Sequence, residues 1–208
     1  RDRPLNADEF AEEKQKLNTV VIDTRDPGAF AGSHVPRALN IWLEGLSYFP
    51  GWVLAYEDRI LLVNEREGDV EQAKVYLWRL GFDRIVGYLC PGIKEWRDLG
   101  KPTEHLGVLS VNALKDMLEQ DKIILLDVRE AREWEEGHIK GALNIYVGHL
   151  KEEADRLPRD KPVATTCEWG GRGGLGASIL NNMGFTNVYN VLGGMRSWRN
   201  LRYPLTSG

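Results

Sequence analysis

The sequence predicts an α/β protein made of two tandem domains, each with a mainly parallel sheet flanked by helices. The first observation behind this prediction is an internal repeat, in which residues 23–41 match residues 127–145 at an offset of 104 positions. Farther along, residues 92–96 match residues 194–198. A repeat of this length indicates a duplicated domain rather than a solenoid unit. The second observation is that short apolar runs alternate with amphipathic segments in each copy, as in a parallel sheet covered on both faces.

The first copy opens with a helix signal. Asn6 and Glu9 have the spacing of a capping box, which predicts a helix that runs toward Leu17. Buried strands are then expected at residues 20–22, 60–63 and 84–86, and further helices at residues 70–80 and 93–99.

The second copy repeats this order. Ser110 is a candidate cap for a helix that runs through Leu118. Strands are expected at residues 123–126, 163–166 and 188–190. We therefore predict a first domain over residues 1–100, a linker over residues 101–109 and a second domain over residues 110–208.

Composition excludes several classes of protein. Of the 208 residues, 42% are hydrophobic and 28% are charged, as in ordinary soluble proteins, and no apolar run reaches the ~18 residues of a membrane helix. A net charge of -4 without a basic block argues against nucleic-acid binding. Two cysteines make no disulfide framework, so we expect a reducing, cytoplasmic location. Because the chain begins with Arg1 instead of methionine, we expect a processed form or a part of a longer protein.

The most informative stretch is the glycine-rich loop that begins at Cys167 and continues through Gly174. It lies between an apolar run at residues 162–166, which predicts a buried strand, and a helical pattern from Leu175 onward. Backbone N–H groups at such a strand-to-helix junction converge on one point and stabilise an anion, so a cysteine there is favoured as a thiolate nucleophile. We predict Cys167 as the catalytic residue. The predicted substrate-binding residues are Glu168, Trp169, Gly170, Gly171, Arg172 and Gly173.

The motifs together resemble the rhodanese family of sulfurtransferases. They are an Asp-x-Arg sequence at residues 127–129, Gly-His-Ile-x-Gly-Ala-Leu-Asn at 137–144, Cys-x-x-Gly-x-Arg at 167–172 and a late Gly-Gly-x-x-x-Trp at 193–198. The resemblance extends over both copies and so covers essentially the whole chain. It implies a rhodanese fold in each half and a persulfide carried on Cys167. It further implies a donor such as thiosulfate or a low-molecular-weight persulfide, a thiol, cyanide or sulfite acceptor, and no metal or organic cofactor.

The first copy departs from this motif at the position that matters most. Asn64 aligns with Cys167, and Asp69 aligns with Arg172. An amide does not carry sulfur, and the carboxylates of residues 64–69 would repel an anionic donor. We therefore interpret the first copy as a non-catalytic rhodanese-like domain. Its expected role is structural, packing against the second domain and forming one wall of the cleft above Cys167.

Glu168 leaves the donor open. A carboxylate beside the nucleophile opposes both the thiolate and an approaching dianion. This weakens the case for thiosulfate and makes an organic persulfide, such as that of glutathione, a serious alternative. Two other classes compete with a sulfurtransferase. One is a Cys-dependent phosphatase or arsenate reductase, although related loops of that kind hold one more residue between Cys and Arg than the four found here. The other is a non-catalytic sulfur-binding or regulatory module.

Other conspicuous residues have structural interpretations. His34 and His138 recur at equivalent positions and are expected to anchor loops, and Cys90 is expected to be a small packed hydrophobe. Arg129 is expected to pair with Glu133. Trp169 is a candidate for the substrate entrance.

A finer resemblance concerns the context of the chain. An inactive copy ahead of an active one, with Phe-Pro-Gly-Trp at residues 49–52, resembles the C-terminal part of metallo-β-lactamase–rhodanese fusion proteins. This resemblance implies a persulfide dioxygenase domain as a partner in a longer chain. The present sequence holds no His-x-His-x-Asp-His segment, so that activity is not assigned to it.

Overall fold

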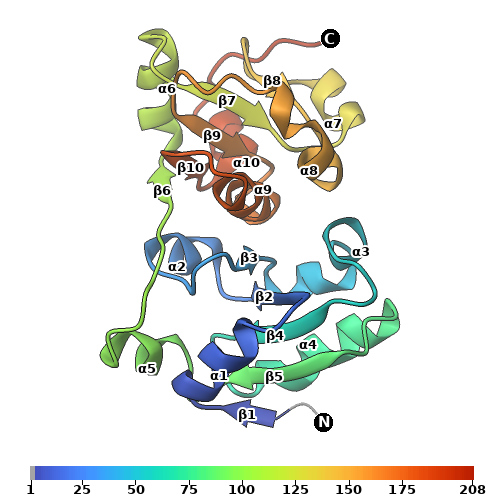
Figure 1. Ribbon diagram of the computed structural model, residues 1–208. Coiled ribbons are helices and arrows are strands. Elements are labelled where there is room, and N and C mark those ends of the chain that lie inside the picture. Colours follow the sequence, from blue (N-terminus) through green and yellow to red (C-terminus); the bar gives the residue numbers. More distant parts are fainter. Residues whose placement is uncertain (1–2) are drawn as a thin grey trace. The chain divides into compact units, whose positions relative to one another are not determined.

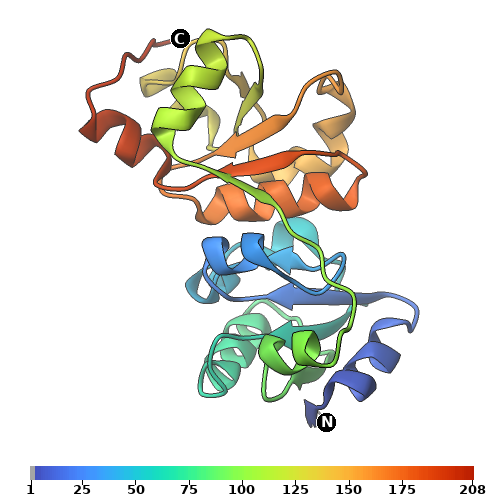
Figure 2. The same ribbon diagram turned by 90° about the vertical axis from the view of Figure 1, so that its left-hand side faces the viewer.

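The protein folds as two compact units, with the boundary between His105 and Leu106. The computed structural model describes residues 3–208 and is shown in Figures 1 and 2. Each unit holds a five-stranded sheet whose strand pairs are all parallel. The strand order is β1-β5-β4-β2-β3 in the first sheet and β6-β10-β9-β7-β8 in the second, the same order twice. The α/β class with two tandem, mainly parallel sheets is thereby confirmed.

The elements of the first unit alternate as the sequence predicts. The strands are β1 (Arg3–Leu5), β2 (Thr19–Asp23), β3 (Leu39–Asn40), β4 (Arg59–Val63) and β5 (Ile85–Leu89). The helices are α1 (Ala7–Lys14), α2 (Pro27–Gly32), α3 (Pro50–Val53), α4 (Asp69–Arg79) and α5 (Ile93–Asp98), with a 3-10 turn η1 at Leu43–Ser47. The two edge strands, β1 and β3, were missed, because strands of two or three residues are too short to show a period.

The second unit repeats the arrangement. Its strands are β6 (Gly107–Leu109), β7 (Ile124–Asp127), β8 (Leu143–Asn144), β9 (Val163–Thr166) and β10 (Val188–Val191). Its helices are α6 (Val111–Glu119), α7 (Ala131–Glu136), α8 (Leu150–Glu153), α9 (Gly171–Asn182) and α10 (Gly194–Asn200), with 3-10 turns η2 (Val147–His149) and η3 (Ala154–Arg156). The segment that we expect to be a linker, residues 101–109, is divided between the units: Glu104 bridges to His34 in the first, and β6 joins the second sheet.

Local signals account for the helix starts. The Asn6 side chain accepts the N–H groups of Asp8 and Glu9, and the Glu9 carboxylate accepts the Asn6 N–H, which completes the predicted capping box. The Ser110 hydroxyl accepts the Ala113 N–H and caps α6. Each cap satisfies backbone donors that the first turn of a helix leaves unpaired.

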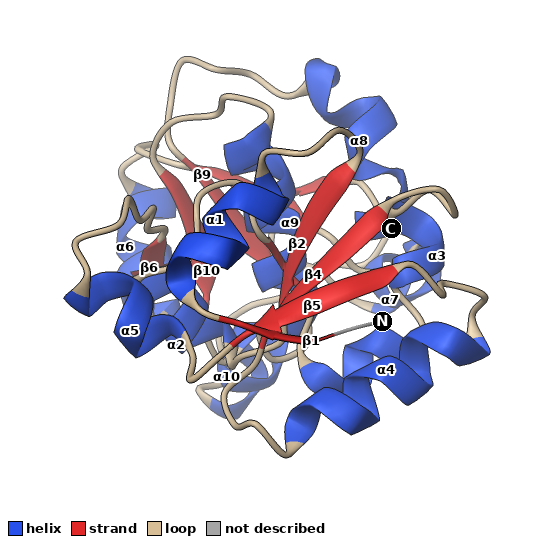
Figure 3. Cartoon of the chain, turned by 60° about the horizontal axis from the view of Figure 1, so that its bottom comes forward, coloured by secondary structure: helices blue, strands red, loops and turns tan. Residues whose placement is uncertain are grey.

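Helices pack on both faces of the second sheet; Figure 3 colours the helices blue and the strands red. On one face, Leu114 of α6 and Trp198 of α10 join a core cluster with strand residues such as Leu125. On the other face, α9 packs on β9 and β10, and in Figure 2 it lies below the strands while α6 lies above them. All four residues of β9 are buried, so its carboxyl end is a fixed point in the core. In open α/β sheets such strand ends carry the ligand sites.

The repeated polar residues hold loops in place. Arg129 forms a buried ion pair with Asp127 at 2.7 Å and also donates to the Gly137 carbonyl. The prediction that Arg129 pairs with Glu133 is therefore wrong, because Asp127 lies two residues away on the same turn. His138 contacts the Trp134 carbonyl through Nδ1 at 2.9 Å and stacks on the Trp134 ring, so it anchors the loop after α7.

Candidate active site

The sulfur of Cys167 lies at the carboxyl end of β9, where the chain turns into α9. Its Sγ accepts the N–H groups of Gly170 at 3.2 Å and of Gly173 at 3.3 Å. The side chain is 1% exposed. Two backbone amides that point at one sulfur favour a negative charge on it, because each N–H carries a partial positive charge.

The loop adopts this shape because glycine stands where the backbone is most crowded. Gly170 has φ +126°, a conformation that L side chains rarely adopt, and its carbonyl accepts the Asn190 side-chain amide at 3.0 Å. A Cβ on Gly173 would lie 2.3 Å from the Asn190 Oδ1, and one on Gly194 would lie 2.2 Å from the Cys167 carbonyl. That carbonyl accepts the Met195 N–H at 2.8 Å, which ties the loop to the start of α10.

Arg172 does not stand free in the loop. From the first turn of α9 its guanidinium forms two hydrogen bonds to the Glu133 carboxylate of α7, at 2.5 and 2.8 Å. Burial alone would lower the pKa of Arg172, but the Glu133 hydrogen bond and the attraction of Cys167 and Glu133 outweigh burial and raise it above its usual value. The positive charge near Cys167 is thus permanent and already carries a carboxylate partner.

This ion pair makes stability depend on pH through Glu133. The Arg172 hydrogen bond, against the opposing effect of burial, holds the pKa of Glu133 below its ordinary value of 4.5. A lowered folded-state pKa adds stability that is fully present above the unfolded-state value and is lost as the pH falls through the folded-state value. We therefore expect Glu133→Gln to destabilise the protein at neutral pH, with a difference from wild type that shrinks as the pH falls below 4.5.

Urea unfolding of both proteins across this pH range measures the difference. Glu136→Gln is the matched control on the same helix, because Glu136 pairs with Arg132 in an exposed ion pair that contributes little at any pH. A destabilisation by Glu133→Gln that stays constant from neutral to acidic pH would contradict the assignment.

Glu168, the residue that follows the nucleophile, is paired outside the loop. Its carboxylate contacts the guanidinium of Arg199 on α10 and lies 3.9 Å from Nε of Arg196. The Arg196 N–H also donates to the Glu168 carbonyl at 2.9 Å. These contacts hold Glu168 against α10, where the positive charges of Arg196 and Arg199 offset its negative charge. Glu168 therefore opposes a thiolate at Cys167 less than the sequence suggests.

A cavity of about 350 Å³ lies beside the loop. It is lined by Arg129, Glu133, Glu136, Gly137, Glu168, Arg199 and Leu205. Three carboxylates against two guanidiniums give its wall an acidic balance.

Trp169 does not line this cavity: the residue is half-buried, and its carbonyl accepts the Gly193 N–H.

Two features of the described residues bear on metal ions and membranes. Within residues 3–208, no group of three or more His, Cys, Asp or Glu side chains is placed to hold a metal ion. In the same part of the chain, no helix has the length and apolar character to cross a membrane.

Comparison with known proteins identifies the fold family. The family model described as "Rhodanese-like domain" matches residues 6–99 and again residues 110–201. The chain belongs to the rhodanese family. Both halves are rhodanese-like domains by this match, which confirms the predicted resemblance to the rhodanese family.

Curated relatives include two bacterial proteins. An uncharacterised protein of Bacillus subtilis, YqhL, is 43% identical over 77 residues, which cover 37% of this chain and 61% of the relative. The thiosulfate sulfurtransferase GlpE of Vibrio cholerae is 29% identical over 102 residues, 49% of this chain and 96% of the relative. Among solved structures, a rhodanese-related protein from Thermoplasma volcanium is 30% identical with a TM-score of 0.46, covering 49% of this chain and 99% of that one.

The first rhodanese-like domain keeps the site position but not the nucleophile. Asn64 follows β4 as Cys167 follows β9, is 8% exposed, and donates through Nδ2 to the Thr24 hydroxyl at 2.7 Å. Asp69, aligned with Arg172, begins α4. The other free thiol of the chain, Cys90, is half-buried. Its pKa is raised, mainly by burial and secondly by the nearby negative charge of Glu67.

The ion-pair partners of the loop that begins at Cys167 were not predicted from the sequence. Glu133 and Arg199 were not assigned to the site, although they hold Arg172 and Glu168. A signal for Glu133 existed in the repeat. Where the second copy has Glu133 and Arg172, the first has Ala29 and Asp69, so both members of the pair change together.

Proposed function

We propose that this protein is a sulfurtransferase that carries a sulfane sulfur as a persulfide on Cys167. The observation that carries the proposal is the sulfur at the end of β9, which accepts two loop N–H groups at 3.2 and 3.3 Å. The donor is a low-molecular-weight persulfide or thiosulfate, and the acceptor is a thiol, cyanide or sulfite. The first domain, with Asn64 in place of the nucleophile, is non-catalytic.

The reaction is a double displacement with a covalent intermediate. The Cys167 thiolate attacks the outer sulfur of the donor, the donor S–S bond breaks, and the donor leaves as a thiolate or as sulfite. The acceptor then attacks the outer sulfur of the Cys167 persulfide, and the Cys167 thiolate leaves. The sulfur atom changes partners without a net external oxidant. Throughout, the N–H groups of Gly170 and Gly173 are placed to stabilise negative charge on the inner sulfur.

The electrostatics of the cavity favour an organic persulfide over thiosulfate. The guanidinium of Arg172 is already paired with the Glu133 carboxylate. The cavity wall holds three carboxylates and two guanidiniums. A dianion has little uncompensated positive charge to meet there, whereas an organic persulfide with an ammonium group meets carboxylates. The volume of about 350 Å³ also exceeds the needs of thiosulfate.

The donor preference is tested by transfer assays with thiosulfate and glutathione persulfide side by side. We expect a higher kcat/KM with the organic persulfide. We expect Glu133→Gln to raise kcat/KM for thiosulfate relative to the persulfide, because it frees the Arg172 guanidinium for a compact dianion and removes a carboxylate that the ammonium group of the persulfide can meet. Glu136→Gln removes a carboxylate from the same wall without touching Arg172 and is the control for bulk charge. If the ratio of kcat/KM for the two donors were the same in the wild type and both variants, this account of specificity would be contradicted.

Two alternatives have direct assays. A Cys-dependent phosphatase needs its loop arginine for the phosphate, but Arg172 is held by Glu133, and four residues separate it from Cys167. Hydrolysis of an aryl phosphate would favour that alternative. A non-catalytic sulfur-binding module would take up sulfur without turning over; mass spectrometry would then detect one added sulfur atom on Cys167 that no acceptor removes.

The cellular setting follows from the chemistry of a free thiol. We expect a reducing compartment such as the cytoplasm, which keeps the Cys167 thiol from being oxidised to a disulfide. A persulfide dioxygenase domain in a longer chain is the partner that the sequence resemblance implies, and it stays a prediction.

A further inference from the structure

The first domain keeps a cavity at the position where the second has its candidate active site. This cavity measures about 320 Å³, close to the other in size. It is lined by Arg25, Ala29, Asn64, Glu65, Pro91, Gly92, Ile93, Lys94 and Arg97.

The charge of this cavity is reversed relative to its counterpart. Three cationic side chains and one carboxylate line it, whereas two guanidiniums and three carboxylates line the cavity of the second domain. The difference in carboxylates has a local cause: Ala29 and Gly32 stand in the first domain where Glu133 and Glu136 stand in the second. The first cavity is therefore better suited to an anion than the second.

Two of these cations have unused binding capacity. Arg25 is 4% exposed, and its Nε and Nη2 donate to Asp23 and to the Ser33 carbonyl; within residues 3–208 nothing accepts a hydrogen bond from its Nη1. Arg97, the counterpart of Arg199, makes no ion pair with any described residue, whereas Arg199 is paired with Glu168. Guanidinium groups with free N–H donors bind carboxylates well.

The floor of the cavity has an unused acceptor. Asn64 is 8% exposed and lines the cavity; its Nδ2 donates to Thr24, but its Oδ1 is buried without a hydrogen-bond partner. A buried carbonyl oxygen without a donor is costly, so a ligand that brings a donor to it gains the bond and removes the penalty.

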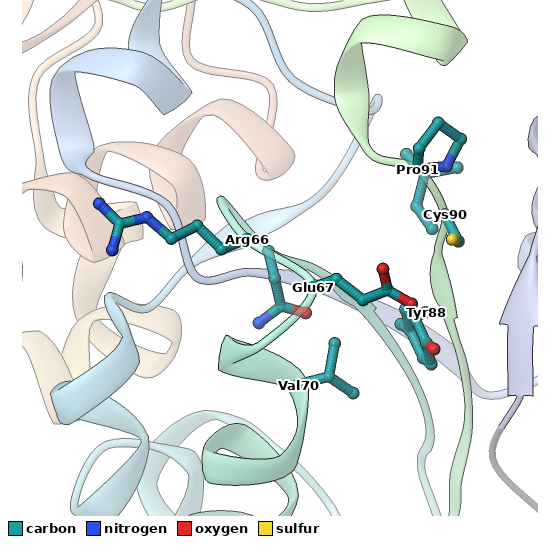
Figure 4. A pocket seen from close by; sticks show the side chains of 8 residues that line it. Arg66, Glu67, Val70, Tyr88, Cys90 and Pro91 are labelled. Carbon is teal, nitrogen blue, oxygen red and sulfur yellow. The ribbon is translucent and has the colours of Figure 1, made fainter.

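The remaining carboxylates of the Asn64 loop lie elsewhere. Glu67 lines a separate small pocket of about 10 Å³ with Tyr88 and Cys90, and Figure 4 shows its side chain directed toward Tyr88. Asp69 begins α4 and does not line the cavity. The sequence suggests that three carboxylates of this loop repel an anion, but only Glu65 lines the cavity.

We infer that the cavity of the first domain is a binding site for a small carboxylate that carries a hydrogen-bond donor, such as a hydroxy, mercapto or amino acid. The carboxylate pairs with Arg97 and the Nη1 of Arg25, and the donor group meets the Oδ1 of Asn64. Binding is reversible and non-covalent, because the position of the nucleophile holds an amide. This inference does not rest on sulfur transfer in the second domain.

The test uses the full chain with Cys167→Ser, so that no ligand reacts at the second site. Lactate and propionate are the probes, since they differ only by the hydroxyl donor, and binding is followed by NMR of the nitrogen-labelled protein. We expect saturable shifts at the amides of residues 92–94, with lactate bound about tenfold more tightly than propionate because of the added hydrogen bond.

Two variants on exposed positions locate the site. Arg97→Gln removes the unpaired cation, and Ala29→Glu installs the carboxylate of the second domain. Each is expected to weaken lactate binding about tenfold, while Arg199→Gln, the matched change in the second domain, leaves it unchanged. No saturable shift with lactate, equal affinity for lactate and propionate, or a loss of binding with Arg199→Gln alone would overturn the inference.

Discussion

Cys167→Ser is expected to abolish sulfur transfer from every donor, down to the uncatalysed background. A serine hydroxyl at the end of β9 would be held by the same N–H groups of Gly170 and Gly173, but it forms no persulfide. The effect is measured as cyanide- or thiol-dependent turnover with thiosulfate and with glutathione persulfide. Mass spectrometry of the wild-type protein after exposure to donor should show one added sulfur atom on Cys167, and the variant should show none.

Cys90→Ser is the matched control for this change. Cys90 is the second free thiol, half-buried in the first domain and with its pKa raised by burial, so it is a poor nucleophile. We expect that variant to retain full transfer activity and the sulfur adduct. Transfer that survives in Cys167→Ser, or is lost in Cys90→Ser, would refute the assignment of the nucleophile.

Gly173→Ala is expected to reduce kcat/KM about 100-fold while the nucleophile stays in place. The added Cβ would lie 2.3 Å from the Asn190 Oδ1, so the first turn of α9 must shift. That shift pulls the Gly173 N–H away from Sγ and disturbs the Asn190 bond that holds the Gly170 carbonyl. Overpacking at such a site also costs about 1–3 kcal/mol of stability.

The loss of activity must be separated from the loss of stability. Transfer is therefore assayed at a temperature where thermal unfolding shows the variant fully folded. Gly68→Ala provides the control, because a Cβ at this first-domain position meets nothing within 4 Å. It should change neither activity nor stability by much. A folded Gly173→Ala protein with wild-type kcat/KM would show that the amide nest does not support catalysis.

Most of the fold was predictable because its signals are local or repeated. The capping box at Asn6, the buried run of β9 and the alternation of strands with helices each depend on neighbours in the sequence. The strands β1, β3, β6 and β8 escaped prediction, since they are two or three residues long and exist through pairing with a longer neighbour. A backbone ladder of that length leaves no pattern in side chains.

By itself the sequence determined which half carries the candidate nucleophile. Cys167 and Asn64 occupy the same place in a duplicated chain, and the glycines after Cys167 predict amides that converge on its sulfur; the chemistry resides in one short loop. The tertiary structure alone decided the charges around that sulfur. Arg172 is held by Glu133, 39 positions away, and Glu168 by Arg199, 31 positions away. These pairs form because α7, α9 and α10 come together at the end of the sheet. Pairing between side chains so far apart in the sequence depends on how the helices pack, which no local sequence pattern encodes.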